Sequence, residues 1–330
     1  MSKRPVLLSY YVTTACNARC GFCAIWQTEE PRFADINDVV RNCNDARKLG
    51  ARFVDFTGGE PLLYPHLVEA LTEAKHCGMY TSITTNTLLY PHYAEQLRKK
   101  IDFLLFSIDG TKSHHDANRG VSCYDTLCES LSLAKSLGER PELLFTVTDA
   151  SVCFLDDVYR LARKYNVMLL LNPLFNYFGP AGLSQRQCKE LRRYGRKPFV
   201  FVNSALLHLI ENGGNNCNAP RCRAVDAAII ISPDNTVLAP CYHKHNYEFP
   251  IGNDLTELYA KKDFPLIRDR QGRFPECDGC TINCWFDPSF EYTFDRYMIK
   301  SLSSRLKYTI DRYLLLPLQS DKNGGHPCSR

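Results

Sequence analysis

The stretch TACNARCGFC, residues 14–23, decides how this 330-residue chain folds and what it carries. It follows the first apolar run and places Cys16, Cys20 and Cys23 in the spacing CxxxCxxC. With 16 cysteines in the chain, roughly 0.04 chance matches to this spacing are expected, so coincidence is a poor explanation. One loop of this kind folds three thiolates around a four-iron four-sulfur cluster and leaves the fourth iron open to a ligand. The alternative, a closed zinc site, usually needs a second cysteine or histidine pair, and none lies near these three.

Polar motifs follow the next three strand-like runs of the chain. TGGEP occupies residues 57–61, directly after the apolar run 52–56. TTN ends a third run at residues 84–86, and SIDG ends a fourth at residues 107–110. Glycines at a strand end let the backbone approach a ligand closely, and a carboxylate there suits an ammonium group. Taken alone, GGEP is also compatible with a tight turn that carries a solvated glutamate.

Together these motifs resemble those of the radical S-adenosylmethionine (SAM) superfamily. The resemblance implies that the GGEP residues hold the amino group of SAM, that Phe22 lies near the adenine, and that the SxDG side chains reach the ribose or carboxylate. It also implies that Arg119 pairs with the SAM carboxylate, against the alternative of a surface arginine. The SAM-binding residues implied in this way are Phe22, Gly58, Gly59, Glu60, Pro61, Asn86, Ser107, Asp109 and Arg119.

Alternating strands and helices in the first half predict an α/β fold. The strand candidates are residues 6–13, 53–57, 81–84, 103–107, 143–148 and 168–171. Asp35 is a suitable N-cap and Gly50 a suitable stop for the helix between the first two strands. We expect a partial (β/α)6 barrel of parallel strands, with the cluster loop, GGEP, TTN and SIDG all at the carboxyl ends of the strands.

A second group of cysteines lies in the last third of the chain. Cys222 and Cys241 flank a hairpin-like run, and CDGCTINC supplies three more cysteines at residues 277–284. This pattern resembles the SPASM and twitch auxiliary-cluster modules of radical SAM enzymes, although Asn235 replaces the usual turn glycine and the final CxxxxxC is missing. The resemblance implies a second, auxiliary [4Fe–4S] cluster on Cys222, Cys241, Cys277 and Cys280, with Cys284 or Cys217 as rival ligands; half a zinc site is the alternative.

We expect four parts: a core barrel at residues 1–175, a helical connector at 176–215, an auxiliary-cluster domain of α+β type at 216–290, and a C-terminal amphipathic helix with a flexible tail at 291–330. The last helix is expected to span residues 290–316, with an apolar stripe that includes Phe294, Leu302 and Leu306. Such a stripe usually packs on the protein's own core. The alternative is contact with an anionic membrane surface, because the helix is also basic.

Composition limits the classes of partner. Forty Lys and Arg against 36 Asp and Glu give a net charge of +4, too balanced to indicate nucleic-acid binding. Since no apolar run is long enough to span a membrane and no signal peptide is apparent, we expect a cytoplasmic protein, with peripheral contact at the inner membrane face as the alternative.

The resemblance implies reductive cleavage of SAM to methionine and a 5′-deoxyadenosyl radical, with electrons from a donor such as flavodoxin or ferredoxin. We expect a hydrophobic small-molecule substrate (a lipid, isoprenoid or tetrapyrrole) and a net oxidation or carbon–carbon bond formation. The grounds are an apparent lack of an N-terminal peptide-recognition domain and aromatic residues expected over the barrel mouth: Tyr177, Phe178, Phe199, Phe201, Trp285, Phe286 and Phe290. The alternatives are a peptide-modifying SPASM-type maturase and a non-catalytic electron carrier. No catalytic acid or base is assigned: His243 and His245, beside Cys241, are candidates, but we expect them to be solvent-exposed loop histidines.

Overall fold

The structure is a computed structural model that describes residues 4–175, 183–261 and 263–318. Within these residues, one open sheet holds ten strands in the order β10-β9-β8-β1-β2-β3-β4-β5-β6-β7. The strands are β1 (Leu7–Thr13), β2 (Phe53–Gly58), β3 (Tyr80–Thr85), β4 (Phe103–Ile108), β5 (Glu142–Val147), β6 (Met168–Pro173), β7 (Val200–Phe201), β8 (Ala228–Ser232), β9 (Thr236–Ala239) and β10 (Tyr247–Pro250). The six predicted strands are confirmed, and all pair in parallel.

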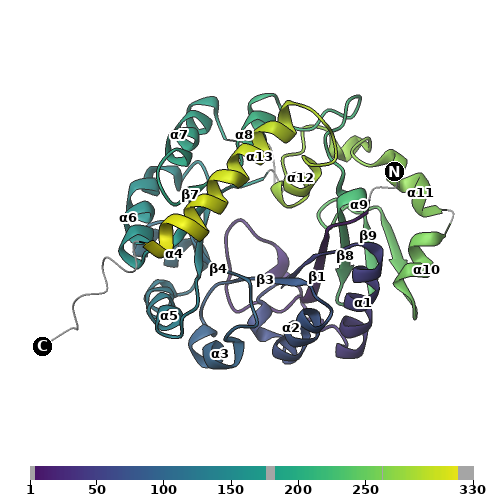
Figure 1. Cartoon of the computed structure of the whole chain (residues 1–330), viewed down its shortest axis with the longest axis horizontal. Helices are drawn as coiled ribbons and strands as arrows, with labels where there is room; N and C mark the ends of the chain where they lie inside the picture. Colours follow the sequence, from purple (N-terminus) through teal and green to yellow (C-terminus); the bar gives the residue numbers. More distant parts are fainter. Residues whose placement is uncertain (1–3, 176–182, 262, 319–330) are drawn as a thin grey trace, which may run out of the picture.

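Helices line the outer side of this curved sheet (Figure 1). The helices of the described residues are α1 (Ile36–Leu49), α2 (Leu67–His76), α3 (Tyr90–Leu97), α4 (Lys112–Arg119), α5 (Tyr124–Ser136), α6 (Leu155–Tyr165), α7 (Gln185–Gly195), α8 (Ser204–Glu211), α9 (Ala224–Ala227), α10 (Leu255–Ala260), α11 (Asp263–Arg270), α12 (Asn283–Ser289) and α13 (Arg296–Thr309), of which α13 crosses the end of the barrel and does not line this outer side. Their ends follow the sequence signals. Asp35 caps α1 by accepting a hydrogen bond from Asn37 N, and Gly50 ends α1 at a φ of 123°.

Successive residues of each strand face opposite sides of the sheet. One side packs against the surrounding helices, and the other side faces the inside of the barrel. One set, which includes Val54, Phe56 and Phe106, packs against the helices in the main core. The other set faces the interior and is only partly buried, and it includes Asp55, Ser82 and Leu144. The core therefore lies between sheet and helices, which leaves the inner face free to bind ligands.

The hairpin of the second cysteine segment continues the barrel sheet. β8 pairs in parallel with β1, and β9 and β10 follow as antiparallel neighbours. Asn235 turns the chain between β8 and β9 at a φ of 55°, which asparagine tolerates better than most residues. As a result, the cluster loop after β1 and the second cysteine segment lie on neighbouring strands, which the sequence did not indicate.

The C-terminal helix differs from the prediction in its start and in its orientation. α13 begins at Arg296, after an N-cap by Asp295, and continues as a π-helix at Ile310–Leu315. The predicted packing of the apolar stripe on the core is wrong, because Phe294, Leu302 and Leu306 are exposed. The buried face is largely polar instead: Ser301, Ser304, Asp311 and Arg312 turn inward, together with Tyr297 in the first turn of α13.

The predicted tail, and the predicted lid residues Tyr177 and Phe178, lie outside the described residues. No described helix combines the length and the hydropathy that a membrane span requires.

Candidate functional site

The cysteine loop leaves the carboxyl end of β1 and is fastened to α4. Arg19 N donates to Arg119 O at 2.8 Å, and Gly21 N donates to Asn118 O at 3.0 Å. Trp26 adds a hydrogen bond from its indole N–H to Cys20 O. The thiols of Cys16, Cys20 and Cys23 interact electrostatically with one another, and burial raises the pKa of Cys16 to about 11. Three convergent soft ligands on one braced loop fit the predicted [4Fe–4S] cluster.

Gly58 and Gly59 are needed for the contact between GGEP and this loop. A Cβ on Gly58 would lie 2.0 Å from Thr13 O, and a Cβ on Gly59 would lie 2.0 Å from Ala15 O. The close approach allows Gly59 N to donate to Thr13 O and Glu60 N to donate to Ala15 O. The glycines therefore hold GGEP against the start of the cysteine loop, a structural role that the sequence did not reveal.

Glu60 is buried, so the alternative of a solvated glutamate in a turn is wrong. Its carboxylate accepts hydrogen bonds from Leu62 N at 3.1 Å and from Asn86 N at 2.8 Å. Burial raises the pKa of Glu60, and these donors together with nearby Arg119 oppose that effect. Asn86 in turn donates from its side chain to Asn17 Oδ1, which ties the TTN motif to the cysteine loop.

Asp109 and Arg119 form a buried ion pair beside the cluster loop. Arg119 Nε lies 2.8 Å from Asp109 Oδ2, and Arg119 Nη2 lies 3.2 Å from Oδ1. Arg119 is only 6% exposed, so the alternative of a surface arginine is wrong. Desolvation alone would lower the pKa of Arg119, but the charge of Asp109 and the hydrogen bonds to it outweigh desolvation and raise the pKa. Arg119 also interacts electrostatically with the thiol of Cys20. A permanent cation therefore lies next to the cysteine loop.

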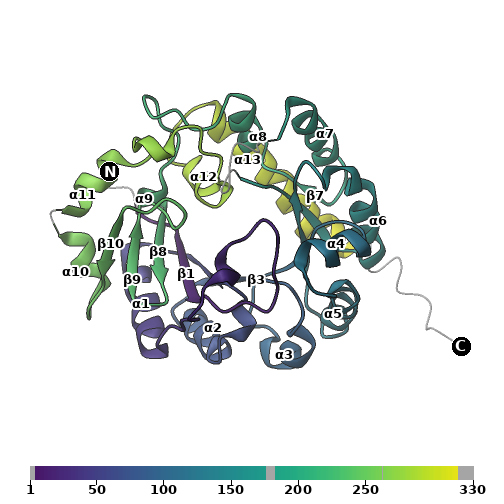
Figure 2. The same cartoon turned by 180° about the vertical axis from the view of Figure 1, so that it is seen from behind.

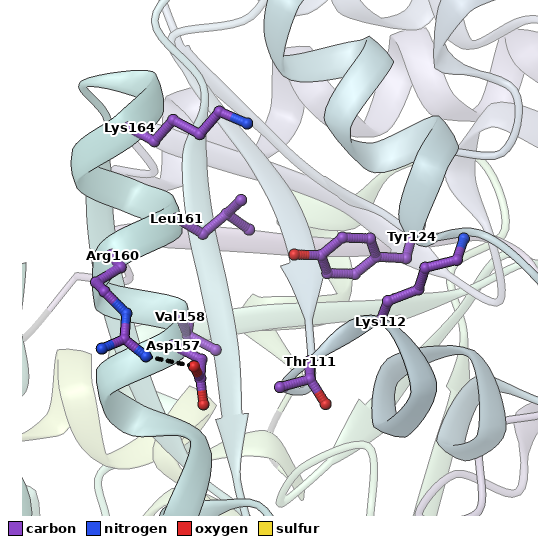
Figure 3. A pocket seen from close by; sticks show the side chains of 9 residues that line it. Thr111, Lys112, Tyr124, Asp157, Val158, Arg160, Leu161 and Lys164 are labelled. Atoms are coloured by element: carbon purple, nitrogen blue, oxygen red, sulfur yellow. Dashed lines mark hydrogen bonds and ion pairs between the residues drawn. The ribbon is translucent and has the colours of Figure 1, made fainter.

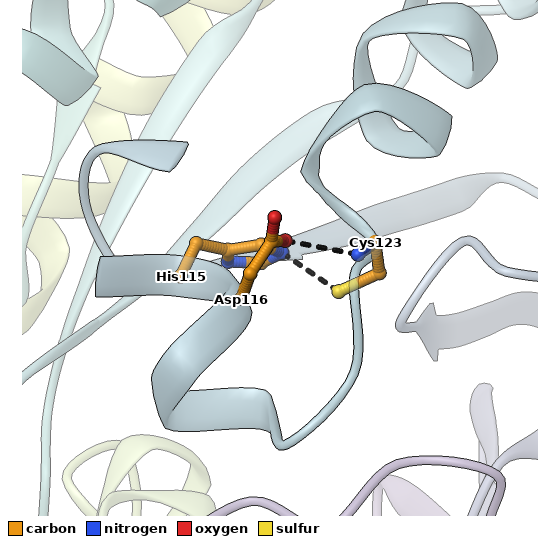
Figure 4. Close-up of side chains that lie close together, drawn as sticks. All are labelled: His115, Asp116 and Cys123. Carbon is orange, nitrogen blue, oxygen red and sulfur yellow. Dashed lines mark hydrogen bonds between the residues drawn. The ribbon is translucent and has the colours of Figure 1, made fainter. Parts of the chain in front are cut away.

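His115 contacts both Asp109 of this ion pair and Cys123, the residue before α5, and Figure 4 shows the contact with Cys123. Its Nδ1 accepts a hydrogen bond from Asp109 N, and its Nε2 lies 3.1 Å from Cys123 Sγ. His115, Asp116 and Cys123 lie close enough for a metal ion. However, Asp116 accepts N–H bonds from Cys123 and Tyr124, and burial lowers the pKa of His115 to about 4. The contacts are those of a structural brace, which the sequence analysis missed.

Phe22 and Ser107 complete the predicted SAM-binding set. Phe22 is half-buried in the cysteine loop, and Ser107 is buried near the carboxyl end of β4. The motifs that are far apart in the sequence thus gather at the carboxyl end of the barrel, around the loop that stands in front in Figure 2.

The second cysteine group also converges. Cys222 interacts electrostatically with Cys241, Cys277 and Cys280, and Cys241 interacts with the latter two. Four soft ligands from separate segments fit a second cluster, and they remain our proposed ligand set. Cys217 lies near Cys277, but its thiol donates to Phe274 O at 3.0 Å.

Cys284 does not join this group, which corrects its suggested role as a rival ligand. Its thiol interacts with Asp55, on the inner face of β2, and with Asp287. The residue is accessible to solvent, but burial of its sulfur, together with the carboxylates of Asp55 and Asp287, raises the pKa of the thiol to about 12. Tyr11, on β1, interacts with both Cys284 and Cys241, and its ring stacks on Tyr242 at a centroid distance of 3.7 Å. A stacked tyrosine pair therefore lies between the second cysteine group and the barrel interior.

Several aromatic residues that were expected to cover the barrel mouth belong to the core. Trp285, Phe286 and Phe290 pack in a second apolar cluster with Tyr297, and Phe199 is buried against Met168 and Leu316. His243 is half-buried and accepts a hydrogen bond from the Trp285 indole, so its expected exposure to solvent is wrong. Burial, with smaller contributions from His245 and Lys244, lowers the pKa of His243 to about 4.

A pocket of about 420 Å³ lies outside the barrel, between the start of α4 and helices α5 and α6 (Figure 3). Its lining mixes apolar and charged side chains, and most of the charges are paired: Arg160 pairs with Asp157, and Lys112 pairs with Asp125. Because it opens on the helical side of the sheet, we do not assign it to the reaction site.

Comparison with known proteins agrees with this geometry. The family described as Radical SAM superfamily matches residues 10–158. The chain is 24% identical over 282 residues to a probable GTP 3′,8-cyclase of Sulfurisphaera tokodaii, covering 78% of the chain and 88% of the relative. It is 24% identical to an AdoMet-dependent heme synthase of Nitratidesulfovibrio vulgaris (69% and 65% covered) and 26% identical to the mycofactocin maturase MftC of Mycobacterium ulcerans (85% and 80%).

Two solved structures share the fold at low identity. Streptococcus suis SuiB bound to the precursor peptide SuiA has a TM-score of 0.68 at 18% identity, covering 84% of this chain and 70% of SuiB. The anSMEcpe protein with bound AdoMet has a TM-score of 0.64 at 17% identity, covering 91% and 99%. With the convergent cysteines and GGEP, these matches identify residues 10–158 as a radical SAM domain and the chain as a radical SAM enzyme, whose cofactors are SAM and a [4Fe–4S] cluster.

Proposed function

We propose that this enzyme abstracts hydrogen from a hydrophobic small molecule in the barrel interior, and that a second cluster takes part in a net oxidation or carbon–carbon bond formation. When bound, the cofactors supply a 5′-deoxyadenosyl radical by reductive cleavage of SAM. The remaining steps depend on how the chain's own residues bind, orient and shield the reactants.

Cys16, Cys20 and Cys23 would ligate the cluster, and the carboxylate of Glu60 would hold the SAM ammonium. Each Glu60 oxygen already accepts one backbone N–H, which fixes the carboxylate and leaves lone pairs for a third partner. Arg119 would attract the SAM carboxylate, since its guanidinium is held in place by Asp109 at the same end of the barrel.

The observation that carries the substrate proposal is an apolar wall on the inner face of the sheet. Leu105, Leu144 and Leu170 occupy the inward positions of β4, β5 and β6 and are only partly buried. Asp55 and Ser82 occupy inward positions of the neighbouring strands β2 and β3 and place polar groups beside these leucines. An inner face with partly buried leucines on three strands and polar groups on the two neighbouring strands suits a hydrophobic molecule with a polar substituent.

A peptide substrate is the second candidate, and it has its own support. MftC is named a maturase, and SuiB was solved with a precursor peptide, while both cover most of this chain. A peptide would have to extend a segment of its chain into the barrel interior. A small molecule would need contact only with the inner face of the sheet.

The decisive experiment compares extracts of cells with and without the gene by untargeted small-molecule and lipid analysis. A lipid, isoprenoid or pigment that changes by one oxidation or one carbon–carbon bond supports the proposal. A change in peptide mass without any small-molecule difference would transfer the assignment to the maturase class. Purified enzyme with Leu144→Asp serves as the matched test of the apolar wall: it should still cleave SAM but lose turnover of the identified substrate.

A further inference from the structure

The outward face of α13 and the π-helix after it carries an apolar stripe. It consists of Ile299, Leu302, Leu306, Ile310 and Tyr313, and we call these five residues the apolar stripe. The spacing of three or four residues keeps them on one side of the helix. Leu306 is 63% exposed and Ile299 is 62% exposed, and neighbouring Leu314 is 61% exposed.

The orientation of this helix is fixed by polar contacts on its inner face. Arg312 donates to Asp102 O, just before β4, and pairs with Glu142, the first residue of β5. Lys307 Nζ donates to Val200 O, at the start of β7, and to Lys197 O. All these partners lie at the amino ends of the strands. The apolar stripe therefore points away from the barrel at the end opposite to the cysteine loop.

Figures 1 and 2 agree with this placement: α13 crosses the near side of the molecule in Figure 1 and lies behind the barrel in Figure 2, where the cysteine loop is in front. α13 therefore does not lie over the carboxyl end of the barrel, where the cysteine loop is.

Positive charge collects at the same end of the barrel. The helices of a β/α unit run antiparallel to its strands, so their basic last turns gather there. Exposed cations at this end are Lys48, Arg52, Arg98, Lys99, Lys135, Arg140, Lys164 and Arg196. Several acidic residues there are paired with cations: Asp45 with Lys48, Asp102 with Lys75, and Glu142 with Arg312. Exposed Phe53 and Tyr80, at the first residues of β2 and β3, add aromatic surface.

We propose that the apolar stripe and the cations around it form a docking surface for an anionic phospholipid bilayer, with α13 lying in the plane of the headgroups. An apolar face buried at the acyl boundary and cations at headgroup level are the two contributions that hold interfacial helices on membranes. A second copy of the chain is a poorer occupant, because packing two such faces together would bring two cationic ends into contact.

The test is flotation of the purified, cluster-loaded enzyme with vesicles. One set contains one part phosphatidylglycerol to two parts phosphatidylcholine, and the other contains phosphatidylcholine alone. We expect flotation with the anionic vesicles, weaker flotation at high salt, and little with the neutral vesicles. Leu302→Glu with Leu306→Glu should lower the partition coefficient by about tenfold or more.

The matched control is Ser132→Glu with Gln185→Glu, which adds the same charge at exposed positions of α5 and α7. It should change flotation by less than about twofold, and both double variants should keep the far-UV circular dichroism of the parent, since all four positions are exposed. Equal binding to both vesicle types, equal effects of both double variants, or no flotation would overturn the proposal. So would a dimer by light scattering that Leu302→Glu with Leu306→Glu converts to a monomer without any lipid binding.

Discussion

The two ends of the barrel are built in opposite ways. At the carboxyl end, short loops bring cysteines, Glu60 and the Asp109–Arg119 pair inward, where backbone donors and one ion pair satisfy them. At the amino end, α13 sends its polar residues inward and leaves its apolar side chains exposed. This difference shows that the polarity of a group does not by itself indicate whether it lies on a binding surface. At the carboxyl end, partners within the chain hold the polar groups in place for a ligand, whereas at the amino end the exposed apolar side chains of α13 are available to a partner outside the chain.

The largest expected effect comes from removing the three loop cysteines. Replacement of Cys16, Cys20 and Cys23 by Ala should abolish SAM cleavage, since no thiolate remains to bind the first cluster. Reconstituted parent protein should bind about eight irons in two clusters, and this variant about four. Iron and sulfide analysis checks the count, with 5′-deoxyadenosine measured by chromatography. A parent value near four would remove the second cluster from the proposal.

At the amino end, Arg312→Ala should cost about 3 to 5 kcal/mol of unfolding free energy, because it leaves the carboxylate of Glu142 buried without its cation. Leu306→Ala, on the exposed side of the same helix, should change stability by less than about 0.5 kcal/mol. Anaerobic denaturant titration measures both. Similar losses for the two variants would show that α13 does not pack through its polar face.

Glu60→Ala should weaken SAM binding by roughly ten- to hundredfold, the value of one buried charge-assisted hydrogen bond of about 1.5 to 3 kcal/mol. Both clusters should still assemble. Glu69→Ala, an exposed glutamate on neighbouring α2, is the control and should leave SAM affinity unchanged. Equilibrium dialysis with labelled SAM gives the two affinities, and an unaltered affinity in Glu60→Ala would leave GGEP with a purely structural role.

The smallest effect concerns Asp55 in the barrel interior. Burial raises the pKa of Asp55 to about 6, above the unfolded value of about 3.9. The protonated form is therefore favoured on folding, and this contribution to stability is present below about pH 4 and is lost as pH rises through about 6. Asp55→Asn should stabilise the protein by about 1 to 2 kcal/mol at pH 8 and have little effect at pH 4. Unfolding titrations at the two pH values test this difference, and a gain of equal size at both would contradict it.

The sequence by itself determined the radical SAM motifs, the six parallel strands and the limits of α1. These features are local: three cysteines on one loop, short apolar runs rich in β-branched and aromatic residues, and an Asp35 cap are readable from neighbouring residues. The four-part division of the chain stays a prediction, as does the ligand set of each cluster.

Only the tertiary structure decided which distant groups meet. The Asp109–Arg119 pair and its brace by His115 join residues across a helix, and the pairing of β8 with β1 joins residues more than 200 apart in the chain. The apolar stripe of α13 shows most clearly what the sequence cannot predict. Periodicity reports that apolar residues share a face, but the partners of Lys307 and Arg312 at the strand ends set which face is buried. Those contacts are long-range, so no pattern within the helix can reveal them.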